Sequence, residues 1–349
     1  MITIHHLLVE AIERGASDLH LTQNAPPILR IDGDLELLEL PPLTPDDTHR
    51  MIYSILNDAQ KARFEEHWEL DLSLDIADVG RYRVNIHKQR GAVEAAFRVV
   101  QEEIRTLRQL GLPPITEEIA RKNSGLILVT GPTGSGKTST LAAMIHQVNS
   151  EQHRMIITVE DPIEYIHRNR KSIVKQREVD SDTHSFTDAL RHVLRQDPDM
   201  VVVGEMRDLE TIATALTAAE TGHLVLATIH TPDTVQTVDR IIDVFPPYQQ
   251  QQVRIQFANT IQAIIAQQLV AIPGGRGRVP AYEILVVTVA ARNIIRNAKT
   301  EQLYTLLQTN YEAGMCTMDK SLKNLYQQGL ISYEDAVTRC KFPEAFESI

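Results

Sequence analysis

The sequence contains little cysteine and no long apolar run, and each shortage excludes a class of protein. Its 349 residues include only Cys316 and Cys340, too few for a disulfide framework or a four-thiolate zinc site. No apolar stretch approaches the roughly 18 residues that a membrane-spanning helix needs. We therefore expect a cytoplasmic protein with no direct membrane insertion.

Acidic residues outnumber basic ones, 46 to 35. The formal net charge is −11, and lysine and arginine form no dense cluster. Binding to nucleic-acid phosphates depends on a localised basic surface, so we expect no nucleic acid as a main partner. The length is sufficient for two domains, each with its own apolar core.

A glycine-rich loop is the feature around which the sequence is organised. Residues 126–130 predict a strand, residues 141–148 predict a helix, and the pattern G-x-x-x-x-G-K-T lies between them. Such a loop turns backbone N–H groups towards a phosphate, and the helix N-terminus adds its positive dipole end. We expect Lys137 to reach the β- and γ-phosphate oxygens and the Thr138 hydroxyl to bind Mg²⁺. The predicted nucleoside-triphosphate site comprises Gly131, Pro132, Thr133, Gly134, Ser135, Gly136, Lys137 and Thr138.

The rest of the C-terminal part alternates strands with helices from about residue 116. This alternation predicts a parallel sheet covered on both faces, and hence an α/β fold. The expected strands are 155–159, 200–204 and 224–228, and the expected helices are 185–196 and 208–222. After residue 247 we expect mostly helix, apart from a hairpin around residues 274–277.

Residues 1 to about 100 predict a small α+β domain. It begins with a helix capped by Thr3, has a hairpin at Asp32-Gly33 and a helix starting at Thr44, and ends with two alternating strands, 81–86 and 93–99. Three arginines lie on the side of these strands opposite to the apolar residues: Arg81, Arg83 and Arg98. A solvated outer surface is the ordinary interpretation of such a face. The charged stretch 101–116 is interpreted as a linker.

Three polar residues follow predicted strands at the edge where the glycine loop lies. They are Glu160, Glu205 and His230. A single glutamate after a strand is usually a solvated turn residue, but three at one edge of a parallel sheet favour a ligand site. We expect Glu205 to act on Mg²⁺ through water and Glu160 to polarise the attacking water, although the two roles could be reversed. His230 is expected to sense the γ-phosphate by a hydrogen bond.

With these residues in place, the chain resembles a known family. Four segments resemble, in order, the four signatures of the secretion ATPases, which are RecA-like ring motors: 131–138, 157–165, 204–208 and 221–230. Further segments resemble the PilT-type branch, the type IV pilus retraction ATPases: 17–21, 81–85, 239–246 and 314–319. Residues 290–297 are similar to the retraction-associated motif of that branch, with Asn297 replacing an acid.

The resemblance implies a RecA-like P-loop ATPase core (residues 117–349, helical from about 247) and a small N-terminal α+β, PAS-like domain (1–100). It implies a homo-hexamer that hydrolyses ATP with Mg²⁺ and powers pilus retraction and twitching motility. Arg81, Arg83 and Arg98 would then be supplied to the triphosphate of a neighbouring subunit. The implied partners are an inner-membrane platform protein and a second retraction ATPase, and the implied location is the cytoplasmic base of the pilus machine.

Two alternative functions remain open at this point. The first is a pilus-assembly or type II secretion ATPase, although those enzymes commonly carry a four-cysteine zinc insertion and a longer N-terminal region that this sequence lacks. The second is an auxiliary nucleotide-gated ring that regulates the main motor.

Overall fold

The computed structural model describes residues 3–31, 33–76, 79–100, 103–274 and 277–346. The chain divides into two compact units, which are described separately. The first comprises Met1–Glu103 with Glu164–Ile166, and the second comprises Ile104–Ile163 with His167–Ile349. None of the helices in these described residues has the length and apolar composition needed to cross a membrane.

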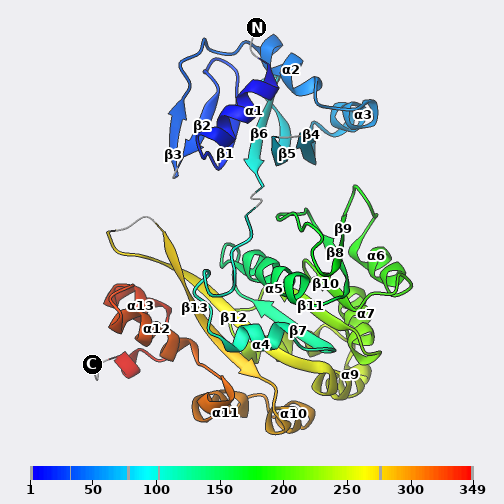
Figure 1. Ribbon diagram of the computed structural model, residues 1–349, viewed down its shortest axis with the longest axis vertical. Helices are drawn as coiled ribbons and strands as arrows, with labels where there is room; N and C mark the ends of the chain where they lie inside the picture. Colours follow the sequence, from blue (N-terminus) through cyan, green and yellow to red (C-terminus); the bar gives the residue numbers. More distant parts are fainter. Residues whose placement is uncertain (1–2, 32, 77–78, 101–102, 275–276, 347–349) are drawn as a thin grey trace. The chain divides into compact units, whose positions relative to one another are not determined.

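The first unit is an antiparallel sheet with three helices in its described residues (Figure 1). The strand order is β3-β2-β1-β6-β5-β4. The strands are β1 (Asp18–Leu21), β2 (Ile28–Ile31), β3 (Asp34–Leu37), β4 (Glu69–Ile76), β5 (Gly80–Gln89) and β6 (Ala92–Val99). The helices are α1 (Ile4–Glu13), α2 (Pro45–Tyr53) and α3 (Asp58–His67). The sequence patterns did not predict α3 and β4, and Asp32 of the predicted hairpin lies outside the described residues.

Helix-capping residues and alternating apolar residues account for several helices and strands of this unit. The α2 helix starts in a capping box, in which Asp47 N donates to Thr44 Oγ1 at 3.2 Å and Thr44 N donates to Asp47 Oδ2 at 3.1 Å. Tyr82, Val84 and Ile86 of β5 are all buried, which confirms the predicted alternation. The Tyr82 hydroxyl donates to Leu8 O at 2.8 Å and so joins the sheet to α1.

The second unit contains a mixed sheet with the strand order β13-β12-β7-β11-β10-β8-β9. All neighbouring pairs are parallel except β12 and β13. Its strands are β7 (Gly125–Thr130), β8 (Met155–Glu160), β9 (Ile173–Glu178), β10 (Met200–Val203), β11 (Leu224–Ile229), β12 (Ile261–Ala271) and β13 (Arg278–Val286). The sequence did not predict β9.

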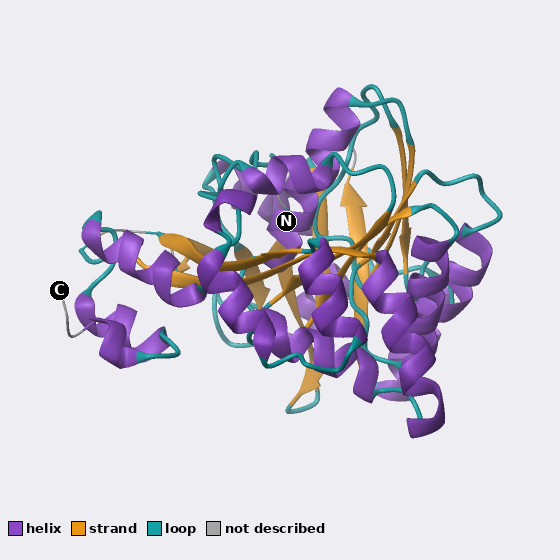
Figure 2. Ribbon diagram, turned by 90° about the horizontal axis from the view of Figure 1, so that it is seen from below, coloured by secondary structure: helices purple, strands orange, loops and turns teal. Residues whose placement is uncertain are grey.

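Helices cover both faces of this sheet (Figure 2). One core contains Ile127 and Val129 of β7 together with residues of α5, while Leu126 and Leu128 belong to another core with residues of α7 and α9. The predicted two-sided parallel sheet is therefore confirmed, and so are the helices predicted at 185–196 and 208–222. The helices are α4 (Ile115–Ala120), α5 (Lys137–Glu151), α6 (Phe186–Val193), α7 (Leu209–Glu220), α8 (Thr234–Asp243) and α9 (Pro247–Thr260).

The region after residue 247 is less helical than predicted. The predicted hairpin is present as β12 and β13, although residues 275–276 lie outside the described part. The prediction missed that β12 is a long core strand that pairs in parallel with β7. Residues 263–266 are buried on both faces of the strand, so period-2 alternation is absent and the pattern does not separate strand from buried helix. The helices of the C-terminal region are α10 (Val289–Arg296), α11 (Gln302–Thr309), α12 (Met318–Gln327) and α13 (Tyr333–Arg339).

Two leucines in the predicted linker 101–116 are packed rather than exposed. Leu107 is 2% exposed and Leu112 is 5% exposed, and both belong to the core that contains α5 residues. Burying two leucines contributes roughly 3–6 kcal/mol to the stability of the second unit. Residues 101–102 lie outside the described part of the chain.

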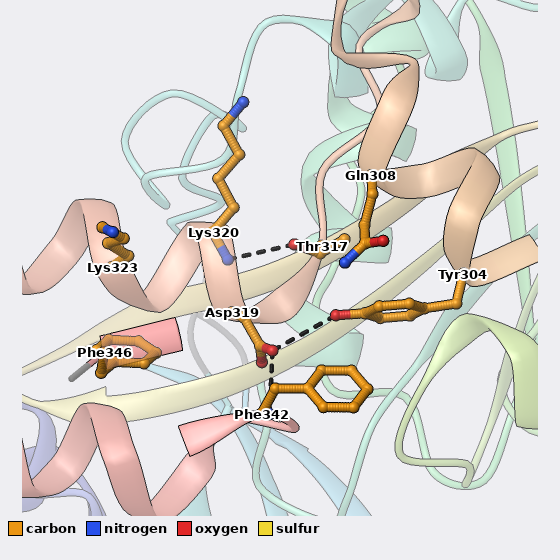
Figure 3. A pocket seen from close by; sticks show the side chains of 8 residues that line it. All are labelled: Tyr304, Gln308, Thr317, Asp319, Lys320, Lys323, Phe342 and Phe346. Atoms are coloured by element: carbon orange, nitrogen blue, oxygen red, sulfur yellow. Dashed lines mark hydrogen bonds between the residues drawn. The ribbon is translucent and has the colours of Figure 1, made fainter. Parts of the chain in front are cut away.

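Residues of the C-terminal region line a partly open pocket of about 280 Å³ (Figure 3). Its lining residues are Tyr304, Gln308, Thr317, Asp319, Lys320, Lys323, Phe342 and Phe346. The buried Asp319 carboxylate accepts hydrogen bonds from Lys341 N at 2.7 Å and Phe342 N at 3.1 Å. Asp319 thereby anchors the segment after α13 to α12. No residue of the glycine loop lines this pocket.

Candidate functional site

The glycine loop connects the end of β7 to the start of α5, as predicted. Gly131, Gly134 and Gly136 have backbone φ angles of 144°, 78° and 89°, which residues other than glycine rarely adopt. At Gly131 space is also short, because a Cβ there would lie 2.3 Å from Gln267 O. The loop therefore depends on glycine at these positions.

Lys137, the first residue of α5, folds back over the loop. Its side chain is almost fully buried, and Nζ donates to Gly131 O at 2.8 Å and to Pro132 O at 3.0 Å. The buried Ser135 hydroxyl has no hydrogen-bond partner within the described part of the protein. A buried ammonium beside an unpaired hydroxyl and a glycine turn matches the donor set that a phosphate group requires. Thr138 is the next residue of α5 and is half-buried.

His230 links Lys137 to Glu205. Lys137 Nζ lies 3.4 Å from His230 Nδ1, and His230 Nε2 lies 3.1 Å from Glu205 Oε1. A lysine can only donate and a carboxylate can only accept, so these neighbours assign the proton of the neutral imidazole to Nε2. The strand register explains the encounter, because β11 lies between β7 and β10 and all three end at the same edge.

A second basic group also holds the Glu205 carboxylate. Arg207 Nε lies 2.7 Å from Oε1, and Arg207 Nη2 donates to Oε2 at 2.8 Å. Burial acts to raise the pKa of Glu205, but the hydrogen bond from Arg207, the electrostatic interaction with the His230 ring and the charge of Arg207 outweigh it and hold that pKa below its usual value. Glu205 is therefore ionised at neutral pH.

Glu160 lies at the same sheet edge as Glu205, but its carboxylate is held by other hydrogen-bond partners. It is the last residue of β8, not a residue beyond the strand, and its Oε1 accepts from Thr158 Oγ1 at 2.6 Å and from Gln176 Nε2 at 3.1 Å. A Cβ on Gly204 would lie 3.2 Å from Glu160 Cα, so the backbone before Glu205 passes close to Glu160. The two predicted glutamates thus belong to neighbouring strand ends, and their catalytic roles stay predictions.

Buried threonines fix the backbone next to His230, and sequence reasoning missed them. Thr130 Oγ1 donates to Thr231 O at 2.6 Å and accepts from Thr231 N at 3.0 Å. Thr231 Oγ1 lies 2.6 Å from Thr237 Oγ1 of α8. This cluster ties the segment after β11 to the end of β7. Thr130 is the polar last residue of an otherwise apolar strand, and this pattern could have indicated its role.

Arg81, Arg83 and Arg98 gather on one face of the first unit, as predicted. Arg83 and Arg98 are direct cross-strand partners, and Arg81 lies two residues away on β5. Each forms an ion pair within that unit, with Asp75, Glu164 and Asp18, respectively. The geometry therefore assembles the three guanidinium groups, while their proposed role towards a nucleotide stays a prediction.

The described residues contain no group of three or more His, Cys, Asp or Glu side chains that could hold a metal by themselves. Mg²⁺ is usually held by one or two protein oxygens together with substrate phosphates and water, so the proposed Mg²⁺ contributors need no such group. Thr138 and Glu205 stay the proposed protein contributors.

The segment 290–297, which resembles the retraction motif, comprises residues 290–296 of α10 and the residue that follows this helix. Ala291 and Ile295 are buried, while Arg296 is exposed and donates to Asn259 Oδ1 at 2.9 Å. Asn297 is the C-cap, and its Nδ2 donates to Asn293 O at 2.8 Å. A carboxylate could not make that bond, so the substitution at this position changes the end of the helix.

The comparisons with known proteins show which family the chain belongs to. Residues 1–338 match the family described as Type II/IV secretion system protein. The chain is 47% identical over 343 residues to the type IV pilus retraction ATPase PilT of Pseudomonas aeruginosa, covering 98% of this chain and 99% of PilT. It is 40% identical over 331 residues to the type IV pilus ATPase PilU of the same organism, covering 95% of this chain and 87% of PilU.

A solved structure extends the likeness to the whole fold. The crystal structure of the pilus retraction motor PilT with bound ADP superposes with a TM-score of 0.94 at 49% identity, and the alignment covers 100% of both chains. The α/β fold expected from the sequence resemblance is thereby confirmed. The chain belongs to the type II/IV secretion system protein family.

Proposed function

We propose that this protein is an ATP-hydrolysing motor that powers the retraction of type IV pili. The observation that carries the proposal is the Lys137–His230–Glu205 arrangement at the glycine loop, in a chain that aligns over nearly its full length with a pilus retraction ATPase. The ADP bound to the similar PilT structure supports an adenine nucleotide as the ligand.

In this proposal the glycine loop and Lys137 bind the phosphates of ATP, the Thr138 hydroxyl would bind Mg²⁺, and Glu205 would act on the metal through water. A Mg²⁺ ion at these residues would supply positive charge to the triphosphate. Glu160 orients and deprotonates the attacking water, or exchanges this role with Glu205. On ATP binding, the Nε2–H of His230 would exchange its present partner, Glu205, for an oxygen of the γ-phosphate. Because Thr231 is tied to β7 and to α8, the loss of that hydrogen bond after hydrolysis would be transmitted into α8.

The motor would work as a homo-hexamer at the cytoplasmic face of the inner membrane. Each subunit would receive Arg81, Arg83 and Arg98 from its neighbour, and closure of successive subunits would turn a membrane platform protein and withdraw pilin. The gathering of the three arginines on one face supports this role. The similarity to PilU supports a second ATPase as a partner.

Replacing Arg83 or Arg98 by alanine is expected to reduce ATP turnover by about 10³-fold while leaving ADP affinity nearly unchanged. The reason is that an arginine finger stabilises the transition-state charge more than the bound ground state. Arg50→Ala, which removes an ion pair with Asp47 on α2, is the matched control. The measurement is steady-state phosphate release by the purified ring.

Mixed rings test whether the arginines act between subunits. An Arg83→Ala subunit has an intact glycine loop, and a Lys137→Ala subunit has intact arginines. If the arginines act across the interface, mixing the two inactive variants restores part of the turnover. Full activity of both Arg83→Ala and Arg98→Ala would refute the shared site.

The pilus phenotype of a deletion strain tests the biological function. Removing a retraction motor is expected to leave abundant surface pili and to abolish twitching motility, because assembly continues without disassembly. Loss of surface pili would instead favour an assembly ATPase. Wild-type pili and motility, together with no ATP turnover by the purified chain alone, would favour an auxiliary ring.

A further inference from the structure

A glutamine on β12 reaches the glycine loop from a strand that lies more than a hundred residues further along the chain. Gln267 is 2% exposed. Its Nε2 donates to Ser135 O at 2.7 Å, and its Oε1 accepts from Thr140 Oγ1 at 2.9 Å. One side-chain amide therefore bridges the loop and the first turn of α5.

The length of β12 brings Gln267 to this position. β12 pairs with β7 up to the register Ala266↔Thr130 and then continues to Ala271 alongside β13 only. Gln267 thus stands beside Gly131, the first loop residue. A Cβ on Gly136 would lie 3.1 Å from Gln267 Nε2, so β12 approaches the loop at both of its ends.

The hydrogen bond to Ser135 O has a consequence for the next amide. In a planar trans peptide the C=O and the following N–H point in opposite directions. Holding Ser135 O towards β12 therefore turns the N–H of Gly136 away from β12. Phosphate loops bind phosphate through N–H groups oriented in this way at the start of the helix.

We propose that Gln267 is a positioning residue that holds the glycine loop in its nucleotide-binding conformation. This inference rests on the proposed function, because it concerns the same phosphate site. An amide suits the position, since it offers a donor and an acceptor on one planar group, whereas a carboxylate only accepts and a methionine does neither well.

The alternative role is purely structural. A buried, fully paired glutamine also stabilises the fold, and its loss leaves Ser135 O and the Thr140 hydroxyl unpaired. A loss of stability alone would lower the fraction of folded protein but would not change the nucleotide affinity of the molecules that remain folded. The test therefore needs a measurement that a structural role does not change.

Gln267→Glu and Gln267→Met provide that test, with Gln268→Glu and Gln268→Met as matched controls on the opposite side of the same strand. At pH 8 both Gln267 variants are expected to bind ADP at least tenfold more weakly than the parent. The Gln268 variants are expected to bind within twofold of the parent. Affinity is measured by isothermal titration calorimetry, and folding by circular dichroism and thermal unfolding.

The pH profile identifies the mechanism. When protonated, the glutamate of Gln267→Glu can donate to Ser135 O, so its ADP affinity relative to Gln268→Glu should recover as the pH is lowered to about 5.5. The ADP affinity of Gln267→Met should stay low over the whole pH range. Variants that are folded and bind ADP like the parent would overturn the inference, as would equal, pH-independent losses in both. If Gln267→Glu does not fold, the affinity of Gln267→Met decides. A parent chain that binds no nucleotide would overturn the proposed function itself.

Discussion

A Lys137→Ala chain is expected to lose nucleotide binding, with ADP and ATP affinities reduced by about 10²-fold or more. Lys137 places a buried ammonium over the loop, where it is held by the carbonyls of Gly131 and Pro132 and by His230. Removing one partner of a buried, hydrogen-bonded charge pair costs about 2–5 kcal/mol, because the other charge is left unpaired. Isothermal titration calorimetry with ADP measures the loss.

Two further variants make this result specific. Lys137→Met keeps most of the apolar stem and removes only the charge, so a similar loss would assign the effect to the ammonium. Lys171→Ala removes an exposed lysine from the same unit and should bind ADP like the parent. ADP affinity of Lys137→Ala within threefold of the parent would contradict the assignment of the phosphate site.

Glu205→Gln is expected to retain ADP and ATP binding within a few-fold and to lose turnover by about 10²–10⁴-fold, the range for a group that manages a proton or a metal-bound water in the transition state. The pKa of Glu205 is lowered by its basic neighbours, so the native group carries a negative charge at neutral pH. Glutamine keeps the shape but removes this charge. Phosphate release measures turnover, and calorimetry measures binding.

Matched variants assign the roles of the two glutamates. Glu210→Gln, on the exposed face of α7 where Glu210 pairs with Arg191, should leave turnover unchanged. Glu160→Gln tests the second acid at the sheet edge. The turnover of both variants is measured as a function of Mg²⁺ concentration. If turnover no longer depends on Mg²⁺ concentration in only one of Glu160→Gln and Glu205→Gln, the residue replaced in that variant is the one that acts on the metal. Parental turnover by purified Glu205→Gln would refute its proposed place in the site.

Short-range features of the fold were predictable because their physics acts over a few residues. Ser185 caps α6 by accepting from Asp188 N at 3.0 Å, three residues away, and Asp208 caps α7 in the same manner. The glycine loop was identified between its strand and helix for the same reason. Parallel topology then supplied the prediction that Glu205 and His230 would end at the loop's edge.

Long-range contacts had no local signature. Gln267 was overlooked because the apolar run before it, buried on both faces of β12, shows neither the period of a strand nor that of a half-exposed helix. Its partner Ser135 lies 132 residues earlier in the chain. The carboxylates that pair with Arg81, Arg83 and Arg98 were equally invisible, because ion pairs between side chains leave no periodic pattern in sequence.

The phosphate loop, the helix caps, the alternating strands and the polar residues that follow the strands could be read from the amino-acid sequence, since each depends on chemistry between close neighbours in the chain. The contact of Lys137 with His230, 93 residues away, and the bracing of the loop by an amide of β12 become visible in the folded chain alone. Strand order and register are settled by burial of the whole sheet, which sums many weak contacts and is not encoded at any single position.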